Sequence, residues 1–259
     1  MVVPFTECGR FSTMPRLDLP FGFIAVQLAF ARRVSTLANV SLGSALIDCT
    51  IIPTLLNIEV THETAEKCVS WQGFLRGLRE AYVPDRWAYD HYVERERREP
   101  EINSSEGYGC FYYSYPFQDQ PKVRLHFRPV DRSGKGALSL EQVPARRAEL
   151  TALFREISSK HPDAETVRGG SWLYNIAPYC RLFPSEYIAS MKPVGYELQF
   201  WALWGQFLKG GFRPDFEAIG RFCEAIALAR TPEECTQCFP YEAMRPECDI
   251  GHFYRFFEI

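Results

Sequence analysis

The sequence predicts an α+β fold, in which a helical N-terminal part is followed by a small mixed sheet flanked by helices. Segments with helical spacing of apolar residues fill the first hundred positions. After them, residues 108–128 are aromatic and alternate between apolar and polar in the manner of strands. The turn-forming stretch 103–107 separates the two kinds of sequence. We therefore expect a helical region at 1–103 and an α+β region at 104–259, packed together as one unit.

Composition narrows the class of protein. The chain has 259 residues, 46% of them hydrophobic, and a formal net charge of -3. A weakly acidic chain has no electrostatic reason to bind nucleic acid or anionic membranes. The first residues do not show the basic and apolar pattern of a signal peptide, so we expect none, and Asp48 and Pro53 interrupt the longest apolar stretch. Nine irregularly spaced cysteines favour reduced thiols, so we expect a cytoplasmic protein without a membrane partner. The composition leaves the oligomeric state open.

Within the first hundred residues the spacing predicts four helices. The first covers 20–38, and the second begins at Ser41 and reaches 55, with a kink or end near Pro53. A third is expected over 61–82, and Asp85 begins a fourth. Near the C-terminus, 198–208 favours a helix over a strand, 214–230 predicts a helix, and Thr231 caps another short one.

The sheet region has clearer signals. Residues 122–128 alternate strictly, which places Val123, Leu125 and Phe127 on one face of a strand. A short connection joins this strand to the aromatic strand before it as an antiparallel hairpin. The helix that follows runs to about 160 and presents a stripe at 150, 153, 154 and 157 to the hairpin. It begins either in a capping box at Ser139 or with Pro144 in its first turn. A third strand covers 166–168.

Polar residues of the alternating strand form the first candidate site. Arg124, His126 and Arg128 project to one side, where arginines suit an anionic ligand and the histidine offers a titratable base. A solvent-exposed strand face explains the same pattern.

A second candidate lies in the segment 169–175, Gly-Gly-Ser-Trp-Leu-Tyr-Asn. Two glycines let the backbone approach a ligand closely, and Ser171, Tyr174 and Asn175 offer bonds to it. The alternative is a glycine bulge, with Trp172 and Tyr174 in the core.

The loop Gly134-Lys135-Gly136 is the third candidate. Its glycines free backbone amides ahead of a helix N-terminus, a position that favours anions, although a plain surface loop has the same composition.

Four residues near the C-terminus have spacing that suits zinc: Cys235, Cys238, Cys248 and His252. The cap at Thr231 places Cys235 and Cys238 in a helix instead of a tight knuckle turn. We therefore expect ordinary buried thiols and no metal site.

The order of elements across 108–183 is strand, strand, glycine loop, helix, strand and Asn-bearing turn. Together with Leu125-His126-Phe127-Arg128-Pro129, Gly136-Ala137-Leu138-Ser139 and Ser171-Trp172-Leu173, it resembles the central part of the GNAT-like N-acyltransferase superfamily. The resemblance implies that amides from Gly134 to Ala137 hold the pyrophosphate of coenzyme A. For such a reaction we expect His126, as the base, and Tyr174 to serve catalysis on an acceptor amine. Asp131 stands where the family usually carries Arg or Gln.

Two functions therefore remain open. One is an acyl-CoA-dependent N-acyltransferase acting on a small amine or amino acid, with acyl-CoA as a substrate and no tightly bound cofactor. The other is a non-catalytic ligand-binding or protein-interaction module on the same scaffold, which Asp131 favours. In both, we expect a positive cleft for a small anionic molecule, lined by one strand and by a second segment: Arg124, His126 and Arg128, with Arg168, Ser171 and Asn175.

Overall fold

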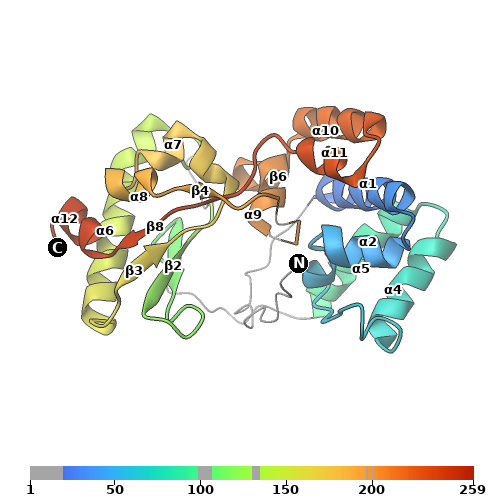
Figure 1. Cartoon of the computed structure of the whole chain (residues 1–259), viewed down its shortest axis with the longest axis horizontal. Helices are drawn as coiled ribbons and strands as arrows, with labels where there is room; N and C mark the ends of the chain where they lie inside the picture. The colour runs from blue at the N-terminus through green and yellow to red at the C-terminus, as the bar shows by residue number, and fades with distance from the viewer. Residues whose placement is uncertain (1–19, 99–106, 130–134, 197, 200) are drawn as a thin grey trace.

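The computed structural model describes residues 20–98, 107–129, 135–196, 198–199 and 201–259. Two lobes lie side by side in Figure 1. One is helical, and the other holds a small mixed sheet flanked by helices. The α+β class expected from the sequence is confirmed.

The helical lobe begins with five helices from the first hundred residues. They are α1 (Phe21–Ala38), α2 (Leu42–Cys49), α3 (Ile52–Leu55), α4 (Val69–Glu80) and α5 (Pro84–Arg98). The Ser41 hydroxyl accepts a hydrogen bond from the Ser44 amide at 3.0 Å and so caps α2, as the sequence predicts. The chain leaves helical geometry at Thr50, and Pro53 lies in the first turn of α3 instead of ending α2.

The helix expected over 61–82 is shorter than predicted. Thr61 and Thr64 form a separate turn, in which the Thr61 amide donates to the Thr64 hydroxyl at 2.9 Å. Cys68 then takes an extended conformation, and α4 starts at Val69. Local side-chain bonds of threonine compete with helix formation, which explains why the predicted start was wrong.

Segments from the C-terminal half return to the helical lobe. These are α9 (Trp201–Trp204), the 3₁₀ turns η3 (Gly205–Phe207) and η4 (Gly210–Phe212), the short pair β5 (Leu208–Lys209) and β6 (Arg213–Pro214), α10 (Phe216–Leu228) and α11 (Pro232–Gln237). Phe30 of α1 contacts the rings of Trp204, Phe222 and Phe239. The region expected at 104–259 is therefore divided between two cores, because residues 203–239 cover the apolar side of α1.

Helix α1 is long and apolar enough to cross a membrane by length and composition, the one such helix in the described part of the chain. Its apolar residues nevertheless pack inside the protein: Phe23, Leu28 and Phe30 are fully buried in the core of the helical lobe. The buried core helix of a globular protein can have the same length and apolar composition as a membrane-spanning helix.

The sheet lobe contains four strands in the order β1-β2-β3-β8: β1 (Phe111–Ser114), β2 (Lys122–Phe127), β3 (Thr166–Arg168) and β8 (Glu247–Asp249). Strands β1 and β2 are antiparallel, β2 and β3 are parallel, and β3 and β8 are antiparallel. The expected hairpin and third strand are confirmed. Strand β8 was not expected. Its three residues, Glu247-Cys248-Asp249, follow a proline and are too few to show the alternation of a strand.

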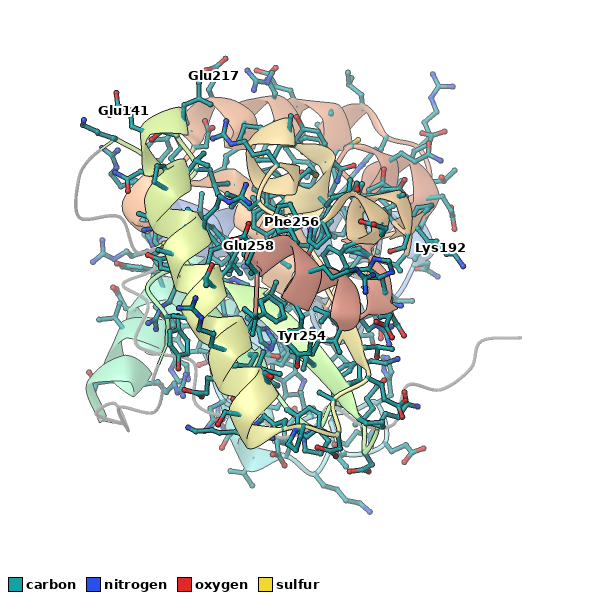
Figure 2. The ribbon with its side chains drawn as sticks, turned by 90° about the vertical axis from the view of Figure 1, so that its left-hand side faces the viewer. Glu141, Lys192, Glu217, Tyr254, Phe256 and Glu258 are labelled. Carbon is teal, nitrogen blue, oxygen red and sulfur yellow. The ribbon has the colours of Figure 1, made fainter. Side chains whose placement is uncertain are left out.

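Helices cover one face of this sheet. Helix α6 (Val143–Lys160) and helix α12 (Gly251–Phe257) lie side by side in Figure 2, and their Phe154 and Phe253 rings stack at 4.5 Å. They bury Val123, Leu125 and Val167. Full burial of a side chain of this size is worth about 1.5–3 kcal/mol relative to exposure. The expected packing of the hairpin on the helix stripe is confirmed.

The rest of the lobe is built from short elements. They are η1 (Leu140–Gln142), η2 (Trp172–Asn175), α7 (Ala177–Cys180), α8 (Ser185–Ala189), β4 (Lys192–Pro193) and β7 (Met244–Arg245). Pro144 lies in the first turn of α6, directly after η1, so the second of the two predicted helix starts is the observed one.

Candidate functional site

The sheet face opposite α6 is polar. Strand register places on this face the side chains of Tyr112, Ser114, Lys122, Arg124, His126, Thr166, Arg168, Glu247 and Asp249. We call this set the polar face. In Figure 1, β2 and β3 lie between α6 and the helical lobe, so the polar face is turned toward the helical lobe.

Two arginines from adjacent strands form the centre of the polar face. Arg124 of β2 pairs in register with Arg168 of β3. Phe117, from the turn between β1 and β2, lies against both: its ring centroid is 4.9 Å from the Arg124 guanidinium carbon and 5.7 Å from that of Arg168. Guanidinium groups are attracted to aromatic faces, so the ring orients both cations. The expectation that Arg124 and Arg168 share one face is confirmed.

A lysine and a glutamate complete the charged group. Lys122 Nζ is 2.6 Å from Glu247 Oε1, and Arg168 Nε is 3.7 Å from Glu247 Oε2. The Lys122 and Arg168 side chains are only 13% and 20% exposed. Ion pairs that are partly withdrawn from water are screened less by salt than those on an open surface.

His126 lies beside this group on β2. Its ring stacks on Tyr112 with centroids 4.6 Å apart and 9° between the planes, and Nε2 is 3.0 Å from Ser114 Oγ. Burial, with a smaller contribution from the Arg124 charge, lowers the pKa of His126 from 6.5 to about 3. The imidazole is therefore neutral at pH 7, with one acceptor and one donor nitrogen.

Arg128 continues the same side of the chain just beyond β2. Its positive charge, with that of Arg124, acts on Tyr112, where burial outweighs both and raises the phenol pKa. The Nε atom of Arg128 is buried and has no hydrogen-bond partner among the described residues. Buried donors without a partner are rare in folded proteins, so Arg128 Nε has a hydrogen bond to offer to a water or a ligand.

The backbone of β2 offers a second feature. The Arg128 amide donates to Cys110 O at 2.8 Å, so Arg128 directs its peptide groups toward β1. Successive residues of an antiparallel strand direct their peptide groups to opposite sides, so those of Leu125 and Phe127 are directed toward β3.

Strand β3 does not extend far enough to pair with all of β2. It ends at Arg168, opposite Arg124, and the next residue pairs with another segment: the Gly169 amide donates to Pro246 O at 3.0 Å. Among the described residues, Phe127 thus has no strand partner on that edge.

The glycine loop leads from β2 toward α6. Gly134 lies outside the described residues. Gly136 has a φ of 89°, a value that favours glycine, and Lys135 Nζ lies 2.5 Å from Glu141 Oε2. The Arg181 side chain donates to the Leu138 carbonyl and so ties the loop to the segment after α7.

Three of the predicted site residues lie away from the polar face. Ser171 Oγ accepts from the Leu173 amide at 3.1 Å and caps η2, and Asn175 Nδ2 donates to the carbonyls of Trp172 and Glu242 at 2.8 and 2.9 Å. Tyr174 is buried in the core, with its hydroxyl 2.9 Å from that of Tyr187. Burial raises its pKa well above 10. Of the residues predicted to line a cleft, those of the strands share the polar face, whereas Ser171 and Asn175 do not lie on it.

The structure accounts for the first of the two glycines, Gly169. A Cβ at this position would overlap with the hydroxyl oxygens of Tyr174 and Tyr187. The absence of a side chain therefore makes room for two buried tyrosines, which is the packing alternative considered for this segment.

Three participants were missed from the sequence. Lys122 was detectable, because it shares the alternation of Arg124. Phe117 lies in a turn, where nothing indicates the direction of the ring, and Glu247 reaches the site only through the unexpected strand β8.

The four residues with zinc-like spacing are divided between the lobes. Cys235 and Cys238 belong to α11 in the helical lobe, whereas Cys248 is on β8 and His252 is on α12, with Nδ1 3.3 Å from Glu186 Oε1. In the described part of the chain, no group of three or more His, Cys, Asp or Glu side chains is placed to hold a metal ion. No protein-family model, curated protein or solved structure matches the chain.

Proposed function

We propose that the protein is an acyl-CoA-dependent N-acyltransferase acting on a small amine or amino acid. One observation carries the proposal: the parallel strands β2 and β3 stop pairing after Arg124 and Arg168, while β2 continues with the Phe127 peptide group directed toward the open edge. An extended ligand that contains amide groups can add to such an edge through backbone hydrogen bonds. The pantetheine arm of coenzyme A has two amides and an extended shape.

The connection after β2 supports the same ligand. It passes through the glycine loop, with Gly136 at positive φ, and enters α6 by way of η1. Backbone amides at the start of a helix favour anions such as a pyrophosphate. The pantetheine edge and the phosphate loop are therefore consecutive in the chain. The order β1-β2-β3-β8, with α6 between two parallel strands, agrees with the resemblance to N-acyltransferases noted above.

In the proposed reaction, the nitrogen lone pair of the acceptor attacks the thioester carbonyl, the C–N bond forms, and the C–S bond breaks. The sulfur leaves as the coenzyme A thiolate, and the nitrogen loses one proton. His126 adjoins the open edge, but its pKa of about 3 makes it a weak base at pH 7. Its neutral ring is suited to accept a hydrogen bond from the acceptor and orient it. The proton passes to solvent.

The pKa values of the predicted catalytic residues favour a second candidate function. A histidine with a pKa of about 3, and a Tyr174 hydroxyl buried against Tyr187, leave no predicted residue with a pKa near 7 for acid–base catalysis. A binding module that holds acyl-CoA without turnover has the same geometry.

Isothermal titration calorimetry of the whole chain with coenzyme A and acetyl-CoA tests the binding claim. We expect binding of both ligands, weakened modestly by Lys135→Ala and unchanged by Lys192→Ala, an exposed lysine on β4. No heat at millimolar ligand excludes both candidates. Loss of thioester absorbance in the presence of an acceptor amine then separates the transferase from the binding module.

A further inference from the structure

Resting on the proposed function, we propose that the acceptor is a free amino acid whose carboxylate binds Arg124 and Arg168 on the polar face. The two arginines are paired across β2 and β3 and lie against one ring, Phe117. Planar guanidinium groups bind carboxylates through parallel N–H···O bonds, which fix both the position and the orientation of the ligand.

Their place on the strand puts such a ligand next to the open edge. Arg124 and Arg168 form the last pair before β2 and β3 separate, and Phe127 lies three residues farther along β2. Three residues of strand span about 10 Å. In the proposed complex the carboxylate binds the two arginines, and the amino group is directed along β2 toward the open edge at Phe127.

His126 lies between these two points on the same face. It is two residues from Arg124, and it is held by the Tyr112 stack and by Ser114 at 3.0 Å. Two residues of strand correspond to about 7 Å. In the proposed complex the neutral ring adjoins the amino group, while Arg124 and Arg168 adjoin the carboxylate and Arg128 lies beyond the ring.

Glu247 argues for a carboxylate over a phosphate. Its carboxylate already lies 2.6 Å from Lys122 and 3.7 Å from Arg168, on the same face as the proposed ligand. Glu247 thus offsets part of the positive charge of Lys122, Arg124 and Arg168, which is the charge that would favour a phosphate dianion over a monoanion. A guanidinium group has five donors, so Arg168 keeps its contact with Glu247 while it binds the ligand.

The test is a binding screen that does not need turnover. The twenty common L-amino acids are compared by thermal shift, and the best one is titrated by calorimetry beside its carboxamide and beside phosphoethanolamine. We expect the amino acid to bind at least about tenfold more tightly than either, the worth of a charge-assisted hydrogen bond. Arg124→Gln and Arg168→Gln should each lower its affinity by at least about tenfold. Arg213→Gln, an exposed arginine of the helical lobe, should not.

The outcomes separate this inference from the proposed function. If acetyl-CoA binds but no amino acid does, or if the carboxamide or the Gln variants bind equally well, the acceptor assignment is wrong and the acyl-CoA site stands. Tighter binding of phosphoethanolamine also overturns the carboxylate assignment. If an amino acid binds as expected but acetyl-CoA does not, the arginine site stands and the transferase is excluded. Circular dichroism of each variant, with Arg168→Lys as a variant that retains the charge, distinguishes lost binding from lost folding.

Discussion

Replacing Gly169 by alanine tests how the segment after β3 is built. The new Cβ would overlap with the hydroxyl oxygens of Tyr174 and Tyr187 and lie 2.6 Å from Tyr174 Cζ. Tyr174 and Tyr187 are only 3% and 0% exposed, so neither ring has room to retreat. Overpacking of a core costs about 1–3 kcal/mol, and breaking the 2.9 Å hydrogen bond between the two hydroxyls adds about 1 kcal/mol. We expect a loss of about 2–4 kcal/mol in the free energy of unfolding.

Urea unfolding followed by tyrosine and tryptophan fluorescence measures this loss. Gly73→Ala is the matched control, because the position is inside α4 and, apart from its chain neighbours and the adjacent helix backbone, no described atom lies within 4 Å of its new Cβ. That variant should gain about 0.5–1 kcal/mol from helix propensity. Adding Tyr174→Phe to Gly169→Ala removes one of the two oxygens and should recover part of the loss. A Gly169→Ala protein as stable as the wild type refutes the packing explanation of the glycine.

Acid sensitivity, helix capping and thiol reactivity provide three further checks. His126 has a folded pKa of about 3, below its ordinary 6.5, so the unfolded chain binds more protons between these values, and stability is lost as the pH falls through that range. His126→Gln should flatten the decline by up to about 1.4 kcal/mol per pH unit in urea titrations, and equal declines would contradict the assigned burial. Asp215 accepts from the Ala218 amide at 3.1 Å, so Asp215→Ala should cost about 1 kcal/mol, and an unshifted urea midpoint would refute the cap. Burial raises the thiol pKa of Cys49 to about 12 and that of Cys248 to about 11, so both should react with a thiol reagent at pH 8 far more slowly in the folded protein than in urea, as peptide mass spectrometry can measure.

The sequence predicted correctly those elements whose stabilising contacts lie between residues close together in the chain. The alternation at 122–128 identified both the strand and the face that carries Arg124, because the side-chain period of a strand is independent of its neighbours. The cap at Thr231 was likewise confirmed, with its hydroxyl 3.1 Å from the Glu234 amide. In each case the decisive contacts lie within a few residues of one another in the chain.

Contacts between distant segments were not predictable in this way. The return of residues 203–239 to the helical lobe depends on Phe222 and Trp204 meeting Phe30, more than 170 residues away. Strand β8 exists because β3 offers it an edge, not because its own sequence alternates. Tyr174 lies in the core for the same reason: only the fold shows that Gly169 opens space for it. The part of the polar face that β2 contributes could therefore be predicted from the sequence, whereas the positions of Phe117 and Glu247 became known only from the structure.

The measurement that tests the central claim most directly is amide hydrogen exchange along β2, with and without saturating acetyl-CoA. The Phe127 amide faces the open edge, whereas Val123 lies where β2 is paired with β3. We predict that acetyl-CoA slows exchange at Phe127 by about fivefold, the worth of about 1 kcal/mol for one hydrogen bond gained there, while Val123 stays unchanged. Exchange at Phe127 that is unaltered by acetyl-CoA, or that is already as slow as at Val123 without it, would contradict the proposed site.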